Sequence, residues 1–470
     1  MRADVLKETL SKNEKDDLKK NAAPIRGLYF LAALIPFLVT AFTAFRFCLE
    51  ILRSDEWSEI PLISKAADGA AGFSDFWAQH NEHRIFFPRL VLVPLAVLSR
   101  WDLRCEIVVN LLLALGTFSV FNALILREDK IFGQTHERWL PAALSVLIFS
   151  LRQGENWVWG IEMVIFMAVF SAVLAFYMLS REHLGARVMG AAILCAVVSS
   201  YSFGAGLFVW PTGLFILLLR ETARVEKVRN VLVWAAAGTL SVIFYFHDFV
   251  RPHHLPSLFF GVHHPAVFYA YFFKYLGSPL FLASSRAFAA GVLGSVVFVL
   301  SLLFLLSRET LSRSVTVAAS APGIFVLLTG FTTALSRCGF SAEQAMAERY
   351  TTISSLFWVS LVLLLVLVSR ELGKNARQGG SWRWGPVFPL CLCGLIVLQS
   401  AWVSHKSYEG IKSLREAVHL AGREVLLEQP WISYDNLYPR KVELEQMLKT
   451  LKRRQLNIFD PAKSDRLLSA

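Results

Sequence analysis

Two adjacent carboxylates, Asp55 and Glu56, follow the first long apolar run of the sequence. Carboxylates at a membrane boundary are costly unless water solvates them or a reaction uses them. A glycosyl transfer passes through an oxocarbenium-like state, and the acceptor hydroxyl must lose its proton to a base. Asp55 is therefore a candidate general base, with Glu56 as its catalytic neighbour. The alternative is a solvated acidic pair that ends a helix.

The densest polar segment runs from Phe76 to Arg89 and is bracketed by aromatic residues. If it is helical, two histidines and an arginine fall on one face. Two histidines with an intervening glutamate can bind a divalent cation, Mg²⁺ or Mn²⁺, but the spacing differs from the HExxH pattern. We favour contacts to phosphate or sugar oxygens, because His and Arg donate hydrogen bonds to both. The candidate sugar contacts are His80, Glu82 and His83, and the candidate phosphate contacts are Arg84 and Arg89.

A second polar segment, RQGENWVWG, joins two apolar runs at residues 152–160, and Glu162 follows seven residues after Glu155. An aromatic belt at the membrane surface explains the tryptophans but not the polar residues beside them. Tryptophan faces next to carboxylates and amides are a common means of gripping a sugar ring. An interfacial hairpin is the alternative. The candidate substrate contacts are Glu155, Asn156, Trp157 and Trp159.

Arg349 and Tyr350 stand where the segment from Arg337 leads into another apolar run, so we expect them at the outer membrane surface. The planar guanidinium of arginine makes two hydrogen bonds to a phosphate and keeps its charge. Both residues are candidate contacts for a donor phosphate. The alternative is an arginine that only anchors the helix at the surface. Four histidines at 253, 254, 263 and 264 lack a nearby Asp, Glu or Cys, and we interpret them as a basic surface near lipid headgroups.

The composition indicates which kind of structure positions these residues. Of 470 residues 55% are hydrophobic and 18% are charged, and the mean hydropathy is +0.49. A spanning helix needs about 20 apolar residues, and backbone groups in lipid must bond within helices. The sequence therefore predicts an all-α polytopic membrane protein whose bilayer partner explains its composition. The net charge of +11 reflects Lys and Arg in short loops, so we expect no nucleic-acid partner.

Hydropathy predicts about eleven transmembrane helices, near residues 27–47, 105–126, 139–151, 161–180, 187–204, 205–219, 231–249, 287–306, 315–336, 351–369 and 386–404. Alternate loops are basic: Arg127, Lys130 and Arg138; Arg181 and Arg187; Arg224, Lys227 and Arg229; Arg308 and Arg313; Lys374, Arg377 and Arg383. The positive-inside rule places these loops and the N-terminus in the cytoplasm. The C-terminus and all the candidate site residues are then outside.

Three parts of the chain follow from this topology. Residues 1–26 form a cytoplasmic tail, and residues 27–404 form the transmembrane domain with a long first outer loop, 49–104, that contains short helices. Residues 405–470 form an extracytoplasmic helical region. There, Ile411, Leu414, Val418 and Val425 recur at helical spacing before Pro430, and a second helix covers Val442 to Leu451. We expect this region to be a small helical cap on the membrane part.

This architecture resembles the GT-C superfamily of membrane glycosyltransferases. The resemblance covers the chain from about Gly27 onward and rests most on Asp55-Glu56, placed just after the first span. The segments HNEHRIFFPRL, QGENWVWG and AERYTT are similar to those of bacterial proteins often grouped there. The resemblance implies an inverting transferase in the bacterial inner membrane that uses a polyprenyl-phosphate-linked sugar, with Asp55 as base and an arginine on the donor phosphate.

The acceptor is open among a lipid, a polysaccharide glycan and a protein. The sequence lacks the WWDYG motif of oligosaccharyltransferases, so protein N-glycosylation is not expected. A transporter or flippase for lipid-linked saccharides is an alternative function, although transporters place ionisable residues near the membrane midplane. A polymerase or ligase is a further alternative, which we expect to carry its largest outer loop between late spans. The longest outer loop here is the first.

Overall fold

The computed structural model describes residues 29, 31–128, 138–308, 313–377, 385–429 and 432–469. Throughout these ranges the regular secondary structure is helical, and no strand is formed. The all-α class predicted from the apolar composition is therefore confirmed. The expected tail at 1–26 and the expected break at Pro430 lie outside the described residues.

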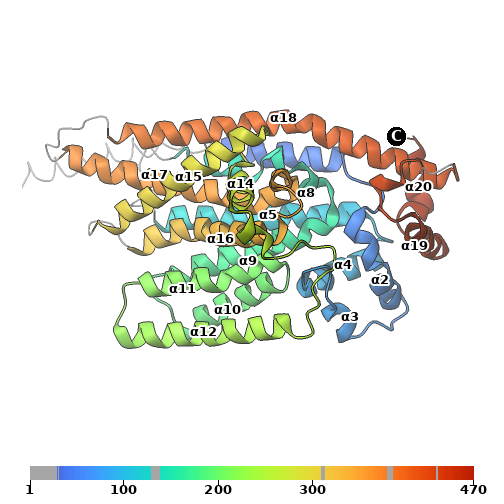
Figure 1. Ribbon diagram of the computed structural model, residues 1–470, viewed down its shortest axis with the longest axis horizontal. Helices are drawn as coiled ribbons and strands as arrows, with labels where there is room; N and C mark the ends of the chain where they lie inside the picture. The colour runs from blue at the N-terminus through green and yellow to red at the C-terminus, as the bar shows by residue number, and fades with distance from the viewer. Residues whose placement is uncertain are drawn as a thin grey trace, which may run out of the picture.

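The helices form one elongated bundle whose members run along its long axis (Figure 1). The helices in the predicted spans are Leu31–Arg46, α5 (Leu103–Arg127), α7 (Leu140–Ile148), α9 (Met163–Leu179), α10 (Ala186–Ser200), α11 (Val209–Leu219), α12 (Arg224–Phe246), α15 (Ser284–Leu306), α16 (Arg313–Arg337), α17 (Thr351–Arg377) and α18 (Val387–Leu426). Each predicted apolar run thus contains a helix.

Seven of the described helices are long and apolar enough to cross a membrane: α5, α9 with the turn before it, α12, α15, α16, α17 and α18. The chain therefore has the helices of an integral membrane protein. Four predicted runs form shorter helices, and α7 has only nine residues. At 1.5 Å per residue α7 rises about 14 Å, less than half of a hydrocarbon core of about 30 Å. The count of eleven spans stays a prediction.

Short helices lie between and beyond the spans. The first loop contains η1 (Ser54–Glu59), α2 (Ile60–Ala67), α3 (Phe73–Trp77) and α4 (Phe86–Leu98). Later connections contain η3 (Leu151–Gln153), α8 (Gly154–Val158), η4 (Gly160–Glu162), η5 (Gly204–Phe208), α13 (Phe260–His263), α14 (Pro265–Gly277), η6 (Ala342–Met346) and η7 (Glu348–Tyr350). The C-terminal region contains η8 (Tyr434–Asn436), α19 (Lys441–Arg454), η9 (Asn457–Phe459) and α20 (Pro461–Ser469).

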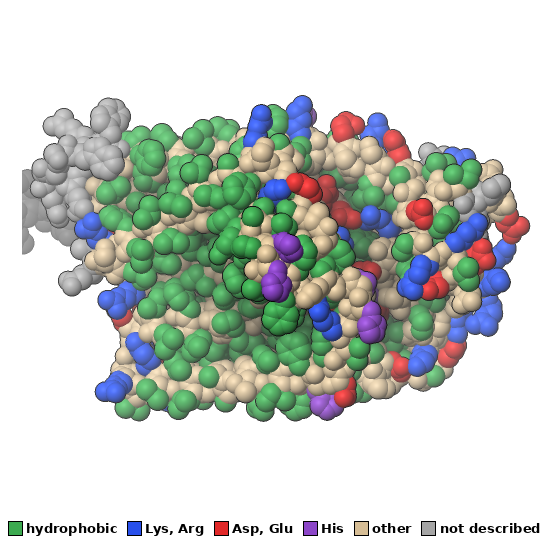
Figure 2. Space-filling view, in the orientation of Figure 1, with side chains coloured by type: hydrophobic (Ala, Val, Ile, Leu, Met, Phe, Trp, Pro, Cys, Tyr) green, Lys and Arg blue, Asp and Glu red, His purple; other side chains and the backbone are tan. Residues whose placement is uncertain are grey.

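Described residues in or beside four of the five predicted cytoplasmic loops contact one another at one end of the bundle, which we call the basic end. Arg127 Nη2 donates to Ser180 Oγ at 3.1 Å, and Ser314 Oγ donates to the Ser180 carbonyl at 2.5 Å. Arg313 pairs with Glu221 at 3.2 Å. Figure 2 shows Lys and Arg gathered at this left-hand end, and a band of hydrophobic side chains between it and the opposite, mixed-charge end.

The first loop and the C-terminal region lie together at that opposite end (Figure 1). Arg454 Nη1 and Nη2 donate to the two carboxylate oxygens of Asp68, at 3.0 and 2.5 Å. Lys463 Nζ donates to the carbonyls of Ser99 and Arg100, at 2.9 and 2.7 Å. The C-terminal region thus packs on the first loop.

One helix, α18, includes both the last predicted span and the first predicted helix of the tail. The predicted boundary at 404/405 therefore falls inside a continuous helix. No proline or helix-ending cap interrupts the sequence there, so the helix continues as its residues change from apolar to polar. Ile411 and Val418 keep an apolar face buried beyond the boundary, each 1% exposed.

Candidate functional site

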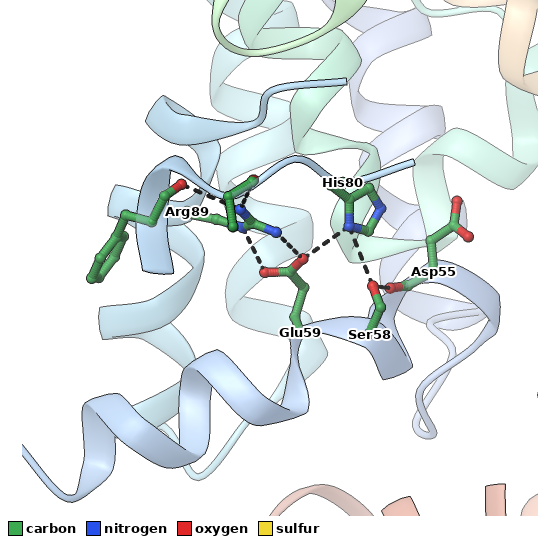
Figure 3. A network of polar contacts seen from close by, with 7 residues as sticks. Asp55, Ser58, Glu59, His80 and Arg89 are labelled. Carbon is green, nitrogen blue, oxygen red and sulfur yellow. Dashed lines mark hydrogen bonds and ion pairs between the residues drawn. The ribbon is translucent and has the colours of Figure 1, made fainter. Parts of the chain in front are cut away.

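Asp55 lies in η1, nine residues after the end of the helix Leu31–Arg46, and its side chain is half-buried. The Asp55 carbonyl accepts a hydrogen bond from Ser58 Oγ at 2.7 Å. Its carboxylate turns away from that contact (Figure 3). Among the described residues no hydrogen bond or ion pair reaches this carboxylate. It lies within electrostatic range of Glu162, Arg337 and Arg349.

Glu56, the next residue, is fully buried. Its Oε2 accepts from the Arg53 amide at 2.9 Å, and its Oε1 accepts from the Ile161 amide at 3.3 Å. Burial raises the pKa of Glu56 to about 7, against the opposing effect of these amides. The two adjacent carboxylates thus differ in environment, and the alternative of a solvated acidic pair does not describe Glu56. Asp55 is the more accessible of the two.

Arg349 stands in η7, at the start of α17, and its side chain is exposed. Its guanidinium lies 5.8 Å from the centre of the Tyr350 ring, and within the described ranges it has no hydrogen-bond or ion-pair partner. The charges of Glu155, Glu162 and Asp55 act on it. We call Asp55, Glu155, Glu162, Arg337 and Arg349 the polar cluster.

Ion pairs fix the elements around the polar cluster. Arg53 Nη1 contacts Glu155 Oε1 at 2.6 Å, and the Arg53 guanidinium lies 5.1 Å from the Trp159 ring centre. The Glu155 amide donates to Glu348 Oε2 at 2.8 Å. Three segments far apart in the sequence, around residues 53, 155 and 348, are therefore joined by charged groups.

A buried arginine, Arg152, helps to hold the same segments together. Arg152 is 4% exposed and donates to the carbonyls of Ser278 at 3.1 Å and Met346 at 2.6 Å. Its Nη1 lies 3.7 Å from Glu348 Oε1. Because a buried charge needs partners, these contacts hold the connections before α8, α15 and α17 in one arrangement.

The predicted sugar contacts of residues 155–159 divide into two groups. Asn156 and Trp157 are fully buried; Asn156 Nδ2 donates to Thr352 Oγ1 at 2.7 Å, and Trp157 Nε1 donates to the Ser150 carbonyl at 3.0 Å. They belong to the interior. Trp159 is 4% exposed and interrupts the helix with an extended backbone. Glu155 alone among the four belongs to the polar cluster.

The segment around His80 and His83 is a tight turn, so the conditional expectation of a helix there is wrong. The two residues exchange backbone hydrogen bonds of 2.8 Å in both directions, and Asn81 takes a left-handed φ of 49°, which asparagine tolerates better than most residues. The turn points the two imidazoles to different partners.

His80 belongs to a network beside Asp55 (Figure 3). Its Nδ1 lies 3.0 Å from Glu59 Oε1 and 3.2 Å from Ser58 Oγ. Arg89 donates to both oxygens of Glu59, from Nε at 2.9 Å and from Nη2 at 2.8 Å. Burial of Glu59 acts to raise its pKa, but the bonds from His80 and Arg89 lower it to about 2. Arg89 therefore has a carboxylate partner already.

His83 lies on the other side of the turn. Its Nδ1 accepts from the Gly204 amide at 3.2 Å, and its Nε2 lies 3.7 Å from Glu82 Oε1. Burial, and then the charge of His80, lower the pKa of His83 to about 3, so the ring is neutral at pH 7. Glu82 forms an ion pair with Arg337. The turn thus reaches the polar cluster through Glu82.

Arg84, a predicted phosphate contact, is 3% exposed. It donates to three carbonyls: Tyr245 at 2.6 Å, Trp77 at 3.1 Å and His247. These contacts join the first loop to the end of α12. Arg84 and Arg89 are thus engaged by the protein, whereas Arg349 is not.

No three His, Cys, Asp or Glu residues in the described ranges lie close enough together to hold a metal ion. The four histidines at 253, 254, 263 and 264 are exposed on the connection around α13. The requirement for a divalent cation remains an open prediction.

Sequence reasoning missed several charged residues of the site: Arg53, Glu59, Arg152 and Glu348. Their adjacency to Asp55, Glu155 and Arg349 in sequence was the available signal. Comparison with protein-family models, curated proteins and solved structures found no match. The fold and the site define an all-helical protein with helices long and apolar enough to span a membrane and with a charged cluster where the first loop, α8 and the start of α17 meet.

Proposed function

We propose that this chain is a membrane glycosyltransferase that moves a sugar from a polyprenyl-phosphate donor to an acceptor hydroxyl. The observation that carries the proposal is the pair of accessible, unpartnered side chains in the polar cluster. Among the described residues the side chains of Asp55, Glu162 and Arg349 have no bonded partner, but Glu162 is buried, so that Asp55 and Arg349 are the accessible ones. An available carboxylate and an available guanidinium near each other suit a reaction between a hydroxyl and a phosphate ester.

The proposed step is a single displacement at the anomeric carbon of the sugar. Asp55 accepts the proton of the acceptor hydroxyl as its oxygen attacks. The bond from the anomeric carbon to the phosphate oxygen breaks, and that oxygen keeps the electron pair. Arg349 donates two hydrogen bonds to the phosphate and stabilises the charge that develops on it. The configuration of the sugar is inverted.

The ion-paired residues of the site support this chemistry by holding the reacting groups in place. The ion pair between Arg53 and Glu155, at 2.6 Å, joins the residue before η1 to α8. The hydrogen bond from the Glu155 amide to Glu348 joins α8 to the residue before Arg349. Correct placement of reacting groups lowers the entropic part of a barrier. Glu155 offers a carboxylate oxygen to sugar hydroxyls in this proposal.

The proposed location is the extracytoplasmic face of a bacterial inner membrane. The basic end, with Arg127 and Arg313, carries the Lys and Arg expected in the cytoplasm. The first loop, which carries Asp55, and the C-terminal region lie together at the other end of the bundle (Figure 1). The acceptor is a lipid, a polysaccharide or a protein that reaches this face.

Asp55→Asn tests the proposal, because asparagine keeps the size of the side chain but cannot accept the proton. Purified protein with labelled polyprenyl-phosphate sugars and acceptor extracts should show a turnover lower by about 10²–10⁴-fold. Asp68→Asn, the same change in the same loop, is the matched control and should retain transfer. Full transfer by Asp55→Asn at normal protein level would reject Asp55 as the base.

A further inference from the structure

The imidazole of His80 bonds to its neighbours through one ring nitrogen only. Its Nδ1 lies 3.0 Å from Glu59 Oε1 and 3.2 Å from Ser58 Oγ. No described residue bonds to the other ring nitrogen, Nε2. The residue is 8% exposed, and Nε2 is not sealed from solvent. The proposed reaction so far gives this free nitrogen no role.

The two partners of Nδ1 decide which ring nitrogen carries the hydrogen. The pKa of Glu59 is about 2, so Glu59 is a carboxylate at pH 7 and can only accept hydrogen bonds. The Ser58 hydroxyl donates its own hydrogen to the Asp55 carbonyl at 2.7 Å, so toward His80 its oxygen can only accept as well. Nδ1 must therefore carry a hydrogen, and in the neutral ring Nε2 has a free lone pair.

Glu59 and Arg89 hold the ring in this form. Arg89 donates to both oxygens of Glu59, at 2.9 and 2.8 Å, and both side chains are buried. A carboxylate that accepts from Nδ1–H fixes the tautomer and the orientation of an imidazole, and it stabilises the imidazolium that forms when Nε2 takes a proton. A proton that arrives at Nε2 of His80 therefore places its charge beside a carboxylate.

The free edge of the ring is the edge that faces Asp55 (Figure 3). The Asp55 carbonyl, Ser58 Oγ and His80 Nδ1 form a chain of contacts of 2.7 and 3.2 Å. The charges of His80 and Asp55 both act on His83, so the two groups share one locality. A carboxylate without a bonded partner and a ring nitrogen without a bonded partner thus lie in the same part of the first loop.

We propose that His80 is a second proton-transfer group of the site, which takes from Asp55 the proton of the acceptor hydroxyl. This inference rests on the proposed function, because it assigns the next position of that proton. The O–H bond of the protonated Asp55 carboxyl breaks, an N–H bond forms at Nε2, and the ring becomes an imidazolium beside Glu59. In water an imidazole holds a proton more strongly than a carboxylate does, so this direction of transfer is favoured. Nε2 then releases the proton to water, and both groups return to their starting states.

His80→Asn tests this relay, because the amide of asparagine replaces the Nδ1–H donor to Glu59 but takes no proton. The full chain in nanodiscs, with labelled polyprenyl-phosphate sugars and acceptor extracts, should turn over about 10²-fold more slowly and unfold at the wild-type temperature. His254→Asn, the same change at an exposed histidine, should keep the wild-type turnover. Free imidazole should restore part of the turnover of His80→Ala, which it would not do for a histidine with a structural role alone.

The tautomer is tested without any transfer. Nuclear magnetic resonance of the full chain with isotope-labelled histidine, at pH 8 and thus above the ordinary pKa of an imidazole, should show hydrogen on Nδ1 and none on Nε2. The signals of His80 are those that His80→Asn removes. Hydrogen on Nε2 in place of Nδ1 would overturn the proposal at any level of activity.

The activities of the variants separate the relay from the proposed function. If Asp55→Asn loses transfer and His80→Asn keeps it, the relay is wrong and the role of Asp55 stands. If His80→Asn loses transfer and Asp55→Asn keeps it, His80 takes the proton directly, and both the relay and the role of Asp55 are wrong. Absence of transfer by the wild type rejects the proposed function and the relay with it.

Discussion

Glu59 receives two hydrogen bonds from the Arg89 guanidinium, at 2.8 and 2.9 Å, and both side chains are buried beside the segment that carries Asp55 (Figure 3). A buried ion pair contributes little net stability when compared with an apolar pair, but the loss of one partner leaves a costly unpaired charge. The pair therefore braces the first loop, and its removal should be visible in the stability of the protein.

Glu59→Gln should lower the free energy of unfolding at pH 7 by about 3–5 kcal/mol, the usual cost of breaking a buried pair. The pKa of Glu59 is about 2 in the folded protein, below its ordinary 4.5. A lowered carboxyl pKa adds stability that is complete above about pH 4.5 and is lost as the pH falls through 2. Thermal unfolding in detergent at pH 7 and at pH 3 should show the difference between variant and wild type shrinking in acid.

The matched control for that experiment is Asp75→Asn, which breaks an exposed ion pair with Lys65 in the same loop. Exposed pairs contribute about 0–1 kcal/mol, so this variant should unfold almost like the wild type. Equal unfolding temperatures for Glu59→Gln and Asp75→Asn would mean that the buried pair does not brace the loop.

Glu56 should make stability depend on pH in the opposite sense. Its pKa is raised to about 7, so between about pH 4.5 and 7 the folded protein holds a proton that the unfolded chain has released. Stability then falls as the pH rises through this window. Glu56→Gln should flatten the decline in unfolding temperature between pH 5 and pH 8. An unchanged slope would show that the Glu56 carboxyl ionises as freely in the folded protein as in the unfolded chain.

Arg349→Lys keeps a positive charge but loses the planar fork. If Arg349 holds the donor phosphate, donor use should weaken by about 1–3 kcal/mol, the value of a charged hydrogen bond. The Michaelis constant and turnover for the labelled donor measure this. Arg313→Lys at the basic end, where the pair with Glu221 is exposed, should leave both unchanged. Unaltered donor kinetics in Arg349→Lys would make Arg349 a surface anchor.

The predicted topology is tested by reporter fusions. Reporters within Arg127–Trp139 and within Arg370–Arg383 should lie in the cytoplasm, and reporters in the C-terminal region should lie outside. The ion pair between Asp68 and Arg454 requires the first loop and that region to share one side. A cytoplasmic C-terminus would contradict the odd number of spans and place the proposed active site in the cytoplasm.

Apolar runs predicted the helices well, because lipid leaves the backbone no alternative. The contacts of the charged residues were harder to predict, since their partners are distant in sequence. Arg53 and Glu155 lie 102 residues apart, and no local pattern connects them. Glu56 is buried and accepts a hydrogen bond from the Ile161 amide, 105 residues away, and no local pattern distinguishes it from the half-buried Asp55 beside it. The turn at His80 depends on backbone bonds and a left-handed Asn81, which a count of helical spacing does not detect.

The continuity of α18 has a mechanical consequence. Its 40 residues extend about 60 Å at 1.5 Å per residue, about twice the thickness of a hydrocarbon core. Because α18 is one continuous helix, it fixes both the distance of the C-terminal region from the bilayer and the direction in which that region faces. At about 100° per residue, three residues inserted near the exposed Gly410 would rotate everything beyond them by about 300° and break its fit to the first loop. The distance between the bilayer and the C-terminal region is thus set by the length of one helix.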